Sequence, residues 1–401
     1  MRVTDVRTMR LLGPDPHGIG GRSRTYEFLF VRIDTDAGVT GTGEAAAFPG
    51  VEDEIRRCRE WLLGRDPFEM RPIVRALMYG ALPADGNLPA PSIMSSTATQ
   101  VGPPVWGASG VEMALCDLTG KALGVSVSTL LGGSFRGRVR VYLDRSGVPD
   151  PSDHDAWRQL ADRAVADGFN FLKFDLEQVA PDMTVDAWNR SLTTAQIDEI
   201  HDRLSVIRDR VGSGTEIALD GHMCFDVDSA LRAAQALRPL RLRWLEDPIP
   251  VTSATSLAEV RQRSPIPICG GEMFTAEQFR QFVEASAIDI GHPDVLFVGG
   301  LHEARRVADL LDVFNLPFAL HNNGSALATV AAAHVGASSP NLLGLEYHFH
   351  DATWIGALAR RNRPLFEDGA ITVDDAPGLG AELDPTVCRR YLAPGEQWFD
   401  E

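Results

Sequence analysis

Short apolar runs that each end in an ionisable residue recur along the second half of the chain. The residues that end these runs are Asp220, Glu246, Glu272, Asp294, His321 and Glu346, and successive members lie 22 to 27 residues apart. This interval fits one strand followed by one helix, and repetition of that unit predicts a (β/α) barrel. Active sites of such barrels lie at the carboxyl ends of the strands, so we expect these side chains to converge there.

The remaining apolar pattern predicts a second lobe before the barrel. Alternating apolar residues over 3–10 and 26–34, followed by VTGTGEA, predict a three-stranded antiparallel meander. Helical spacing of apolar residues predicts helices at 51–63, 66–80, 108–122, 155–167 and 302–314. The apolar faces of the last three extend to Leu123, Val165 and Phe314, which we expect to be buried.

Two further barrel strands are expected at 138–144 and 170–176. Segment 13–24 is too rich in Gly and Pro for regular structure and is a candidate mobile loop. Segment 177–193 is longer than an ordinary βα connection, and long loops at this face usually cover the active site. After residue 359 the periodicity fades into Pro- and Gly-rich sequence, which we expect to pack back on the first lobe.

Composition limits the class of protein. The chain has 401 residues, 44% of them hydrophobic, which suffices for a barrel and a second lobe. Its net charge of −17 argues against nucleic acid or an anionic membrane as a partner. Five scattered cysteines form no C-x-x-C pair, so neither a disulfide framework nor a zinc ribbon is indicated. Without an apolar signal segment, we expect a cytoplasmic protein.

Lysine is nearly absent from the chain. Of 38 basic residues only Lys121 and Lys173 are lysine, and Lys173 lies in the apolar run GFNFLKFDL. A lysine retained there suggests a property that arginine lacks, such as losing its proton in a desolvated pocket. A structural ion pair with Asp175 is the alternative.

The carboxylates predict a metal site. One carboxylate alone serves as often to cap a helix, but three on successive strands repel one another unless a cation lies between them. Mg²⁺ prefers oxygen ligands and keeps positions for water or substrate, so it suits this set better than Zn²⁺, with Mn²⁺ as an alternative. Asp247 is interpreted as starting a loop, and His292 and His348 as structural residues.

Several motifs together resemble a known family. They are ASGVEMALCDLTGKALGVSVSTLLGG, GFNFLKFDL, ALDGH, WLEDP, GGE, HPDVLFVGG, LHNNG and GLEYH. In this order and spacing they resemble the enolase superfamily, mandelate racemase subgroup, over nearly the whole chain. The resemblance implies the α/β class, with an α+β capping domain over 1–130, a (β/α)7β TIM-like catalytic barrel over 131–360, and a C-terminal segment over 361–401 that returns to the capping domain.

The same resemblance implies roles for the candidate site residues and a homo-oligomeric state. Asp220, Glu246 and Glu272 match the ligands of Mg²⁺, and Asp294 and His321 match a catalytic dyad. The match for Glu346 hydrogen-bonds the substrate carboxylate.

Departures from the family pattern narrow the activity. The racemase has two lysines in K-x-K on the second strand, whereas K-F-D here places Asp175 at the second position. Residues 286–300 contain no lysine, which disfavours the cycloisomerase and dipeptide-epimerase relatives. His222 follows Asp220 in D-G-H, on what we expect to be the same strand face, and D-x-H resembles the acid-sugar dehydratases. A packing role for His222 is the alternative.

These features predict a Mg²⁺-dependent dehydratase of a sugar acid, either an aldonate or an aldarate. His321, oriented by Asp294, removes the C2 proton; Lys173 stabilises the enediolate as a cation and Glu346 as a protonated donor. His222 protonates the departing 3-hydroxyl to give a 2-keto-3-deoxy acid. The alternatives are a racemase or epimerase that uses Lys173 and His321, and a non-catalytic metal-binding scaffold. Substrate specificity is expected to come from loops 13–24, 45–52 and 177–193.

Overall fold

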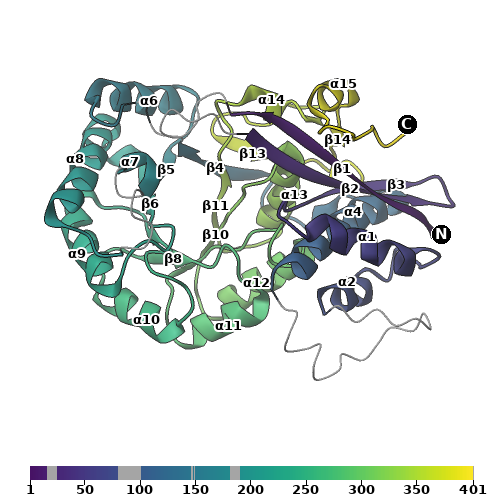
Figure 1. Ribbon diagram of the computed structural model, residues 1–401, viewed down its shortest axis with the longest axis horizontal. Coiled ribbons are helices and arrows are strands. Elements are labelled where there is room, and N and C mark those ends of the chain that lie inside the picture. Colours follow the sequence, from purple (N-terminus) through teal and green to yellow (C-terminus); the bar gives the residue numbers. More distant parts are fainter. Residues whose placement is uncertain (16–24, 80–100, 146–147, 149, 181–189, 401) are drawn as a thin grey trace.

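The computed structural model describes residues 1–15, 25–79, 101–145, 148, 150–180 and 190–400. The predicted loops 13–24 and 177–193 lie largely outside these residues. A barrel of parallel strands ringed by helices occupies one side of the molecule, and a smaller lobe of sheet and helices covers the other side (Figure 1).

The smaller lobe is the predicted meander packed on helices. Its sheet has the order β1 (Val3–Pro14), β2 (Thr25–Thr35) and β3 (Thr40–Ala45), all antiparallel. Its helices are α1 (Val51–Leu62), α2 (Met70–Met78), α4 (Pro103–Leu123) and α5 (Val127–Leu130). Gly41 and Gly43 let β3 lie directly on α4, because a Cβ on either residue would overlap the α4 backbone. We refer to this lobe as the cap.

The barrel is closed and follows chain order. Its strands are β4 (Arg138–Arg145), β5 (Phe171–Asp175), β6 (Glu216–Asp220), β7 (Leu245–Glu246), β8 (Ile268–Gly270), β9 (Ile290–Gly291), β10 (Phe318–Leu320) and β11 (Leu342–Tyr347). Each strand pairs in parallel with the next, and β11 pairs with β4 to close the ring. This arrangement confirms the predicted barrel.

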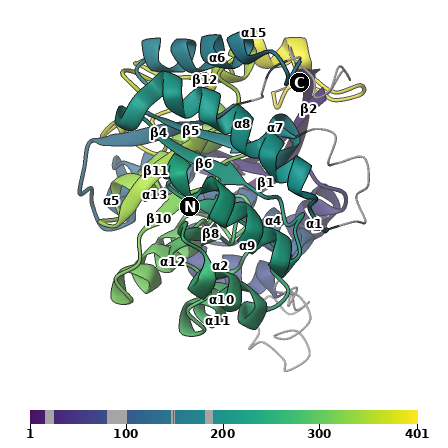
Figure 2. The same ribbon diagram turned by 90° about the vertical axis from the view of Figure 1, so that its left-hand side faces the viewer.

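Helices fill the connections between consecutive strands. They are α6 (His154–Ala166), α7 (Leu176–Val179), α8 (Thr194–Val211), α9 (Val227–Leu237), α10 (Ala254–Arg263), α11 (Ala276–Glu284), α12 (Leu301–Val313) and α13 (Ala326–Ala337). Polar caps start several of them: Asp153 accepts hydrogen bonds at the start of α6, and Thr193 at the start of α8. Figure 2, seen from the barrel side, shows α8 and α9 in front of the strands. With one main helix per connection among the described residues, the topology is (β/α)7β.

An aromatic layer inside the barrel forms the floor beneath the strand ends. Tyr142, Phe171 and Trp244 are fully buried, and the ring centroids of Phe171 and Trp244 lie 4.8 Å apart. Side chains on the same inward-facing positions of the other strands complete this layer. Because this layer fills the interior, a ligand at the mouth of the barrel would lie above the floor, at the carboxyl ends of the strands.

The C-terminal segment returns to the cap. The elements after β11 are α14 (Thr353–Gly356), β12 (Ala359–Arg360), β13 (Ala370–Thr372), β14 (Glu382–Leu383) and α15 (Pro385–Cys388), and the last three belong to this segment. β13 pairs antiparallel with the start of β4. Further on, Leu392 bridges to Leu11 in β1, and Asp400 lies 2.7 Å from Arg32 in β2. The domain limits at 130 and 360 stay predictions.

Three apolar residues that we expected to be buried are exposed. Leu123, Val165 and Phe314 are 56%, 46% and 46% exposed. Each lies in the last turn of its helix or just beyond it, where the helix has passed its packing partner, so the apolar periodicity continues although the contact has ended. Among the described residues, no helix is both long and apolar enough to cross a membrane.

Candidate active site

Three carboxylates meet at the carboxyl ends of neighbouring barrel strands. Asp220 and Glu246 are the last residues of β6 and β7, and Glu272 lies two residues after β8. One oxygen of each lies within 4.8 Å of the others. Asp220 and Glu246 are buried, whereas Glu272 lines a cavity at the barrel mouth. The sequence-predicted ligand set is therefore assembled at one point.

The chemistry of this cluster fits a divalent cation. Burial and the charge of Glu246 raise the pKa of Asp220 well above its ordinary value, because ionised carboxylates at this distance repel one another. A cation between them would remove that repulsion. The donor set consists only of oxygen and opens on the cavity side, which suits a hard cation that keeps positions for water or substrate.

Lys173 lies among four carboxylates on the floor of the site. Its Nζ is 2.6 Å from Glu346 Oε1, 3.0 Å from Asp220 Oδ2, 3.3 Å from Glu246 Oε1 and 3.7 Å from Asp144 Oδ2. Burial alone would lower the pKa of Lys173, but these carboxylates raise it well above its ordinary value. The expectation that Lys173 loses its proton is therefore wrong, because these carboxylates favour its ammonium form.

Asp294 and His321 form the predicted dyad. His321 Nδ1 lies 2.6 Å from Asp294 Oδ2, and the other Asp294 oxygen accepts a hydrogen bond from Leu296 N–H at 2.6 Å. This contact turns His321 Nε2 toward the cluster, 3.1 Å from Glu272 Oε2. Asp294 is fully buried, so the imidazole orientation is fixed by a side chain that does not itself line the cavity.

The charge of His321 depends on its carboxylate neighbours. Burial lowers the pKa of His321, but Glu272, Glu346 and the hydrogen bond with Asp294 outweigh it and raise that pKa to about 10. Because much of this increase comes from Glu272, a cation bound to Glu272 would bring the pKa back toward neutrality. A histidine in that range is suited to act as a base.

His222 reaches the cavity by a different route from the one predicted. We expected it on the same strand face as Asp220, but β6 ends at Asp220 and His222 has a left-handed backbone with φ of 44°. Its N–H donates to Asp220 Oδ1 at 2.8 Å, and its Nε2 lies 3.3 Å from Asp220 Oδ2 and 3.9 Å from Asp175 Oδ1. The imidazole of His222 is therefore positioned by a turn that Asp220 holds, and not by the alternation of side chains along the strand.

Glu346 is ionised in this environment. Burial raises the pKa of Glu346, but the field of Lys173, followed by those of His348 and His321, outweighs it and lowers the pKa to about 2. The prediction that Glu346 is a protonated donor is therefore wrong. Glu346 instead acts as the counter-charge that holds Lys173.

His348 and Asp144 line the cavity but were given no site role from the sequence. His348, interpreted as structural, lines the cavity with Nδ1 at 3.0 Å from Asp144 Oδ2 and Nε2 at 3.3 Å from Glu346 Oε1. Asp144 ends the apolar run VYLD in β4, which is the same pattern that identified the other strand ends. That pattern was sufficient to find Asp144, whereas nothing comparable marks His348, which lies beyond its strand.

His292 supports the cluster from below, in agreement with a structural role. Its Nδ1 lies 2.9 Å from Glu246 Oε1 and its Nε2 2.6 Å from the hydroxyl of Tyr142. The other Glu246 oxygen accepts a hydrogen bond from Trp244 Nε1 at 3.0 Å. These contacts fix the orientation of the Glu246 carboxylate from the floor of the barrel.

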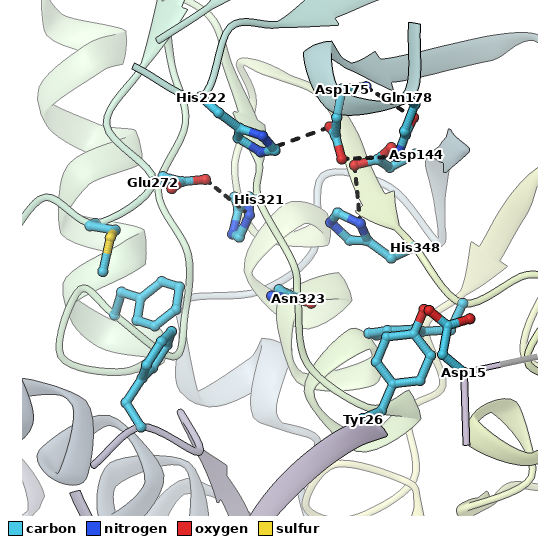
Figure 3. A pocket seen from close by; sticks show the side chains of 14 residues that line it. Asp15, Tyr26, Asp144, Asp175, Gln178, His222, Glu272, His321, Asn323 and His348 are labelled. Atoms are coloured by element: carbon cyan, nitrogen blue, oxygen red, sulfur yellow. Dashed lines mark hydrogen bonds and ion pairs between the residues drawn. The ribbon is translucent and has the colours of Figure 1, made fainter. Parts of the chain in front are cut away.

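The cavity above these groups has a volume of about 200 Å³ and lies between barrel and cap. Figure 3 shows His222 and His321 facing it from one side and His348 from the other, with Tyr26 and Asp15 of the cap opposite the strand ends. Its lining comprises Asp15, Tyr26, Phe48, Asp144, Asp175, Gln178, His222, Glu272, Met273, Phe297, His321, Asn323, His348 and Phe349. Apolar rings and acidic or imidazole groups thus share the wall.

Comparison with known proteins finds similarity over the whole chain. Residues 3–132 match the family "Mandelate racemase / muconate lactonizing enzyme, N-terminal domain", and residues 156–387 match "Enolase C-terminal domain-like". A D-xylonate dehydratase of Haloferax volcanii is 33% identical across 100% of this chain and 91% of its own. A D-galactonate dehydratase of Ralstonia nicotianae is 28% identical across 99% and 96%.

A solved structure is also similar over nearly the whole chain. The crystal structure of a mandelate racemase/muconate lactonizing enzyme-like protein from Rubrobacter xylanophilus has a TM-score of 0.87 to this chain. The two are 32% identical, and the match covers 99% of each chain.

Proposed function

Because this chain belongs to the mandelate racemase/muconate lactonizing enzyme family of the enolase superfamily, we propose that it is a hydro-lyase that dehydrates sugar acids. The observation that carries the proposal is the position of two imidazoles at one cavity. His321 and His222 both face the space beside the Asp220 cluster. Dehydration needs two such groups, one to take a proton and one to give a proton.

The first half of the reaction is removal of the C2 proton. A divalent cation on Asp220, Glu246 and Glu272, taken here as Mg²⁺, would withdraw charge from the substrate carboxylate and acidify the neighbouring C–H. His321 takes the C2 proton on Nε2, while Asp294 holds Nδ1 and stabilises the imidazolium. Lys173 supplies fixed positive charge for the enediolate oxygen, because its proton is held by the surrounding carboxylates.

The second half is loss of the 3-hydroxyl. The electron pair left at C2 forms the C2–C3 double bond as the C3–O bond breaks. His222 donates a proton to the departing oxygen, which leaves as water. The resulting enol tautomerises to a 2-keto-3-deoxy acid. The left-handed turn at His222 matters here, since it places the imidazole at the cavity edge and not on the strand axis.

An aldonate is the favoured substrate class. The similar proteins from Haloferax volcanii and Ralstonia nicotianae are named for D-xylonate and D-galactonate, both aldonates. Racemisation with Lys173 as the second base is disfavoured, since its Nζ lies within 4 Å of four carboxylates that hold its proton. A cytoplasmic, homo-oligomeric enzyme stays the prediction.

A substrate screen tests this function. Purified protein with Mg²⁺ is incubated with a panel of aldonates and aldarates, and 2-keto-3-deoxy acid is measured with and without a chelator. We expect turnover of at least one aldonate, lost with the chelator and restored by excess Mg²⁺. Epimerised product without keto acid would indicate the racemase alternative, and no metal-dependent turnover of any acid would indicate a scaffold.

A further inference from the structure

Asp144 is a buried carboxyl group that interacts with Asp175, His348 and Lys173 but accepts no regular hydrogen bond from an N–H group of the described residues. It is 2% exposed and lines the cavity at the end of β4. Neither of its oxygens accepts a hydrogen bond of regular geometry from an N–H or hydroxyl group of the described residues. His348 Nδ1 lies 3.0 Å from Oδ2 but does not meet that geometry. A buried acceptor in this state costs free energy unless a ligand or water completes it.

The neighbouring His348 is also incomplete. Its Nε2 has no regular hydrogen bond within the described part of the chain, and it lies 3.3 Å from Glu346 Oε1, which Lys173 Nζ contacts at 2.6 Å. Burial lowers the pKa of His348 to about 3, so this imidazole is neutral and can both donate and accept. Asp144 and His348 therefore present acceptors and a donor to the same part of the cavity.

The barrel topology places Asp144 and His348 across the mouth from Glu272, while Lys173 Nζ, 3.7 Å from Asp144, also contacts Asp220 and Glu246. In the ring of strands β4 lies opposite β8, so Asp144 and His348 face Glu272 across the mouth. A substrate with its carboxylate at the Asp220 cluster and its C2 and C3 near His321 and His222 must extend its remaining carbons toward another part of the cavity. In a sugar acid those carbons carry hydroxyls.

We propose that Asp144 and His348 form a hydroxyl-binding subsite that selects the configuration of the sugar chain beyond C3. This inference rests on the proposed dehydratase function. A substrate hydroxyl can donate a hydrogen bond to Asp144 and accept one from His348, so that both side chains gain a hydrogen bond that they lack in the free protein. Asp144 and Asp175 both line this wall, and burial together with the charge of Asp175 raises the pKa of Asp144 well above its ordinary value, so further negative charge, such as a second substrate carboxylate, is disfavoured there. The subsite therefore favours aldonates over aldarates.

The test compares a substrate with its deoxy analogues. kcat/KM is measured for the best aldonate and for analogues that each lack one hydroxyl beyond C3, with wild type, Asp144→Ala and His348→Gln. For the hydroxyl that binds here, we expect wild type to prefer the parent by about a hundredfold or more, since a site built for a hydroxyl rejects the analogue without it. Both variants should lose far more activity on the parent than on the analogue, and bring the ratio to within about tenfold of one.

Asp117→Asn is the matched control. Asp117 is a fully buried carboxylate in α4 that holds Lys121 and does not line the cavity, so its loss perturbs stability alone. We expect its parent-to-analogue ratio to equal that of wild type. Equal losses on parent and analogue in folded Asp144→Ala and His348→Gln would overturn the subsite while leaving the dehydratase intact. If wild type made no keto acid, the proposed function itself would fail.

Discussion

Glu44 in the cap accepts hydrogen bonds from the first turn of the barrel helix α13. Ser325 N–H donates to Oε1 at 2.7 Å, and Ser325 Oγ and Ala328 N–H donate to Oε2 at 2.5 and 3.3 Å. Glu112 of α4 does the same for α12, where it accepts from Leu301 N–H at 2.7 Å. Cap carboxylates thus occupy the positive ends of two barrel helices.

These two helices follow the strands of the dyad. α12 begins seven residues after Asp294, and α13 begins five residues after His321. The cap therefore stabilises the connections that hold the base and its partner, so the position of His321 depends on an intact contact between Glu44 and α13.

The burial of Glu44 predicts that the stability of the protein depends on pH. Burial raises the pKa of Glu44 to about 7 from 4.5, although the donors of α13 oppose that shift. The folded state thus binds the Glu44 proton more tightly than the unfolded state does, so its contribution is present below pH 4.5 and is lost as pH rises through 7. Glu44→Gln cannot titrate. We expect the wild-type free energy of unfolding, relative to Glu44→Gln, to fall by up to about 3 kcal/mol between pH 4.5 and 8.

Denaturant unfolding at several pH values measures this difference. Glu60→Gln on the exposed side of α1 is the control and should show no such trend relative to wild type. A difference between wild type and Glu44→Gln that stays constant with pH would contradict the prediction.

Removing any one metal ligand should weaken cation binding without unfolding the barrel. Asp220→Asn, Glu246→Gln and Glu272→Gln each delete one charge from the cluster. Mg²⁺ that binds the folded state raises the melting temperature in proportion to its affinity. We expect a clear rise for wild type, little or none for each variant, and no keto-acid formation by the variants. A variant with the wild-type thermal response to Mg²⁺ would remove that residue from the ligand set.

The strand-end carboxylates could be predicted because their chemistry follows from periodicity alone. Parallel strands of a barrel align their carboxyl ends, so a polar residue after each apolar run must lie at the mouth. This rule identified Asp220, Glu246 and Glu272, and it applies equally to Asp144 at the end of β4. It says nothing of residues past the strand, and His348 was therefore assigned a structural role.

Protonation states and turn geometry could not be predicted from the sequence. Whether Glu346 is neutral or ionised depends on Lys173 Nζ at 2.6 Å, a contact between strands 173 residues apart in the chain. His222 reaches the cavity through a positive φ that a D-G-H motif does not specify. The contact between Glu44 and α13 joins two lobes whose relative placement is likewise not readable from local pattern.

Variants of His321 and His222 should fail at different steps. His321→Asn removes the base, so both exchange of the C2 proton with deuterated solvent and keto-acid formation should be lost. His222→Asn should block loss of the 3-hydroxyl while C2 exchange stays detectable by NMR. Dehydration at the wild-type rate by His222→Asn would contradict its role as the acid. Loss of C2 exchange by both variants would instead indicate that His222 acts before the elimination.

Lys173 should be needed both to neutralise the buried carboxylates around it and for the reaction. Lys173→Met leaves four carboxylates without their buried cation, so we expect the free energy of unfolding to fall by about 3–5 kcal/mol. Mg²⁺ should restore part of this loss. In the folded fraction kcat should drop roughly a hundred- to thousandfold, because the charge that stabilises the enediolate is gone.

The only other lysine provides the control for this variant. Lys121 pairs with Asp117 at 2.7 Å and with Glu382 at 2.5 Å, away from the cavity, so Lys121→Met should lose stability but keep kcat. Lys173→Arg tests geometry, since it keeps the charge but adds a planar fork to a side chain that is 1% exposed. We expect it to lose most of kcat as well. If Lys173→Arg matched wild type in kcat and in its thermal response to Mg²⁺, any buried cation would serve at this position, and the specific role of the ammonium would have to be withdrawn.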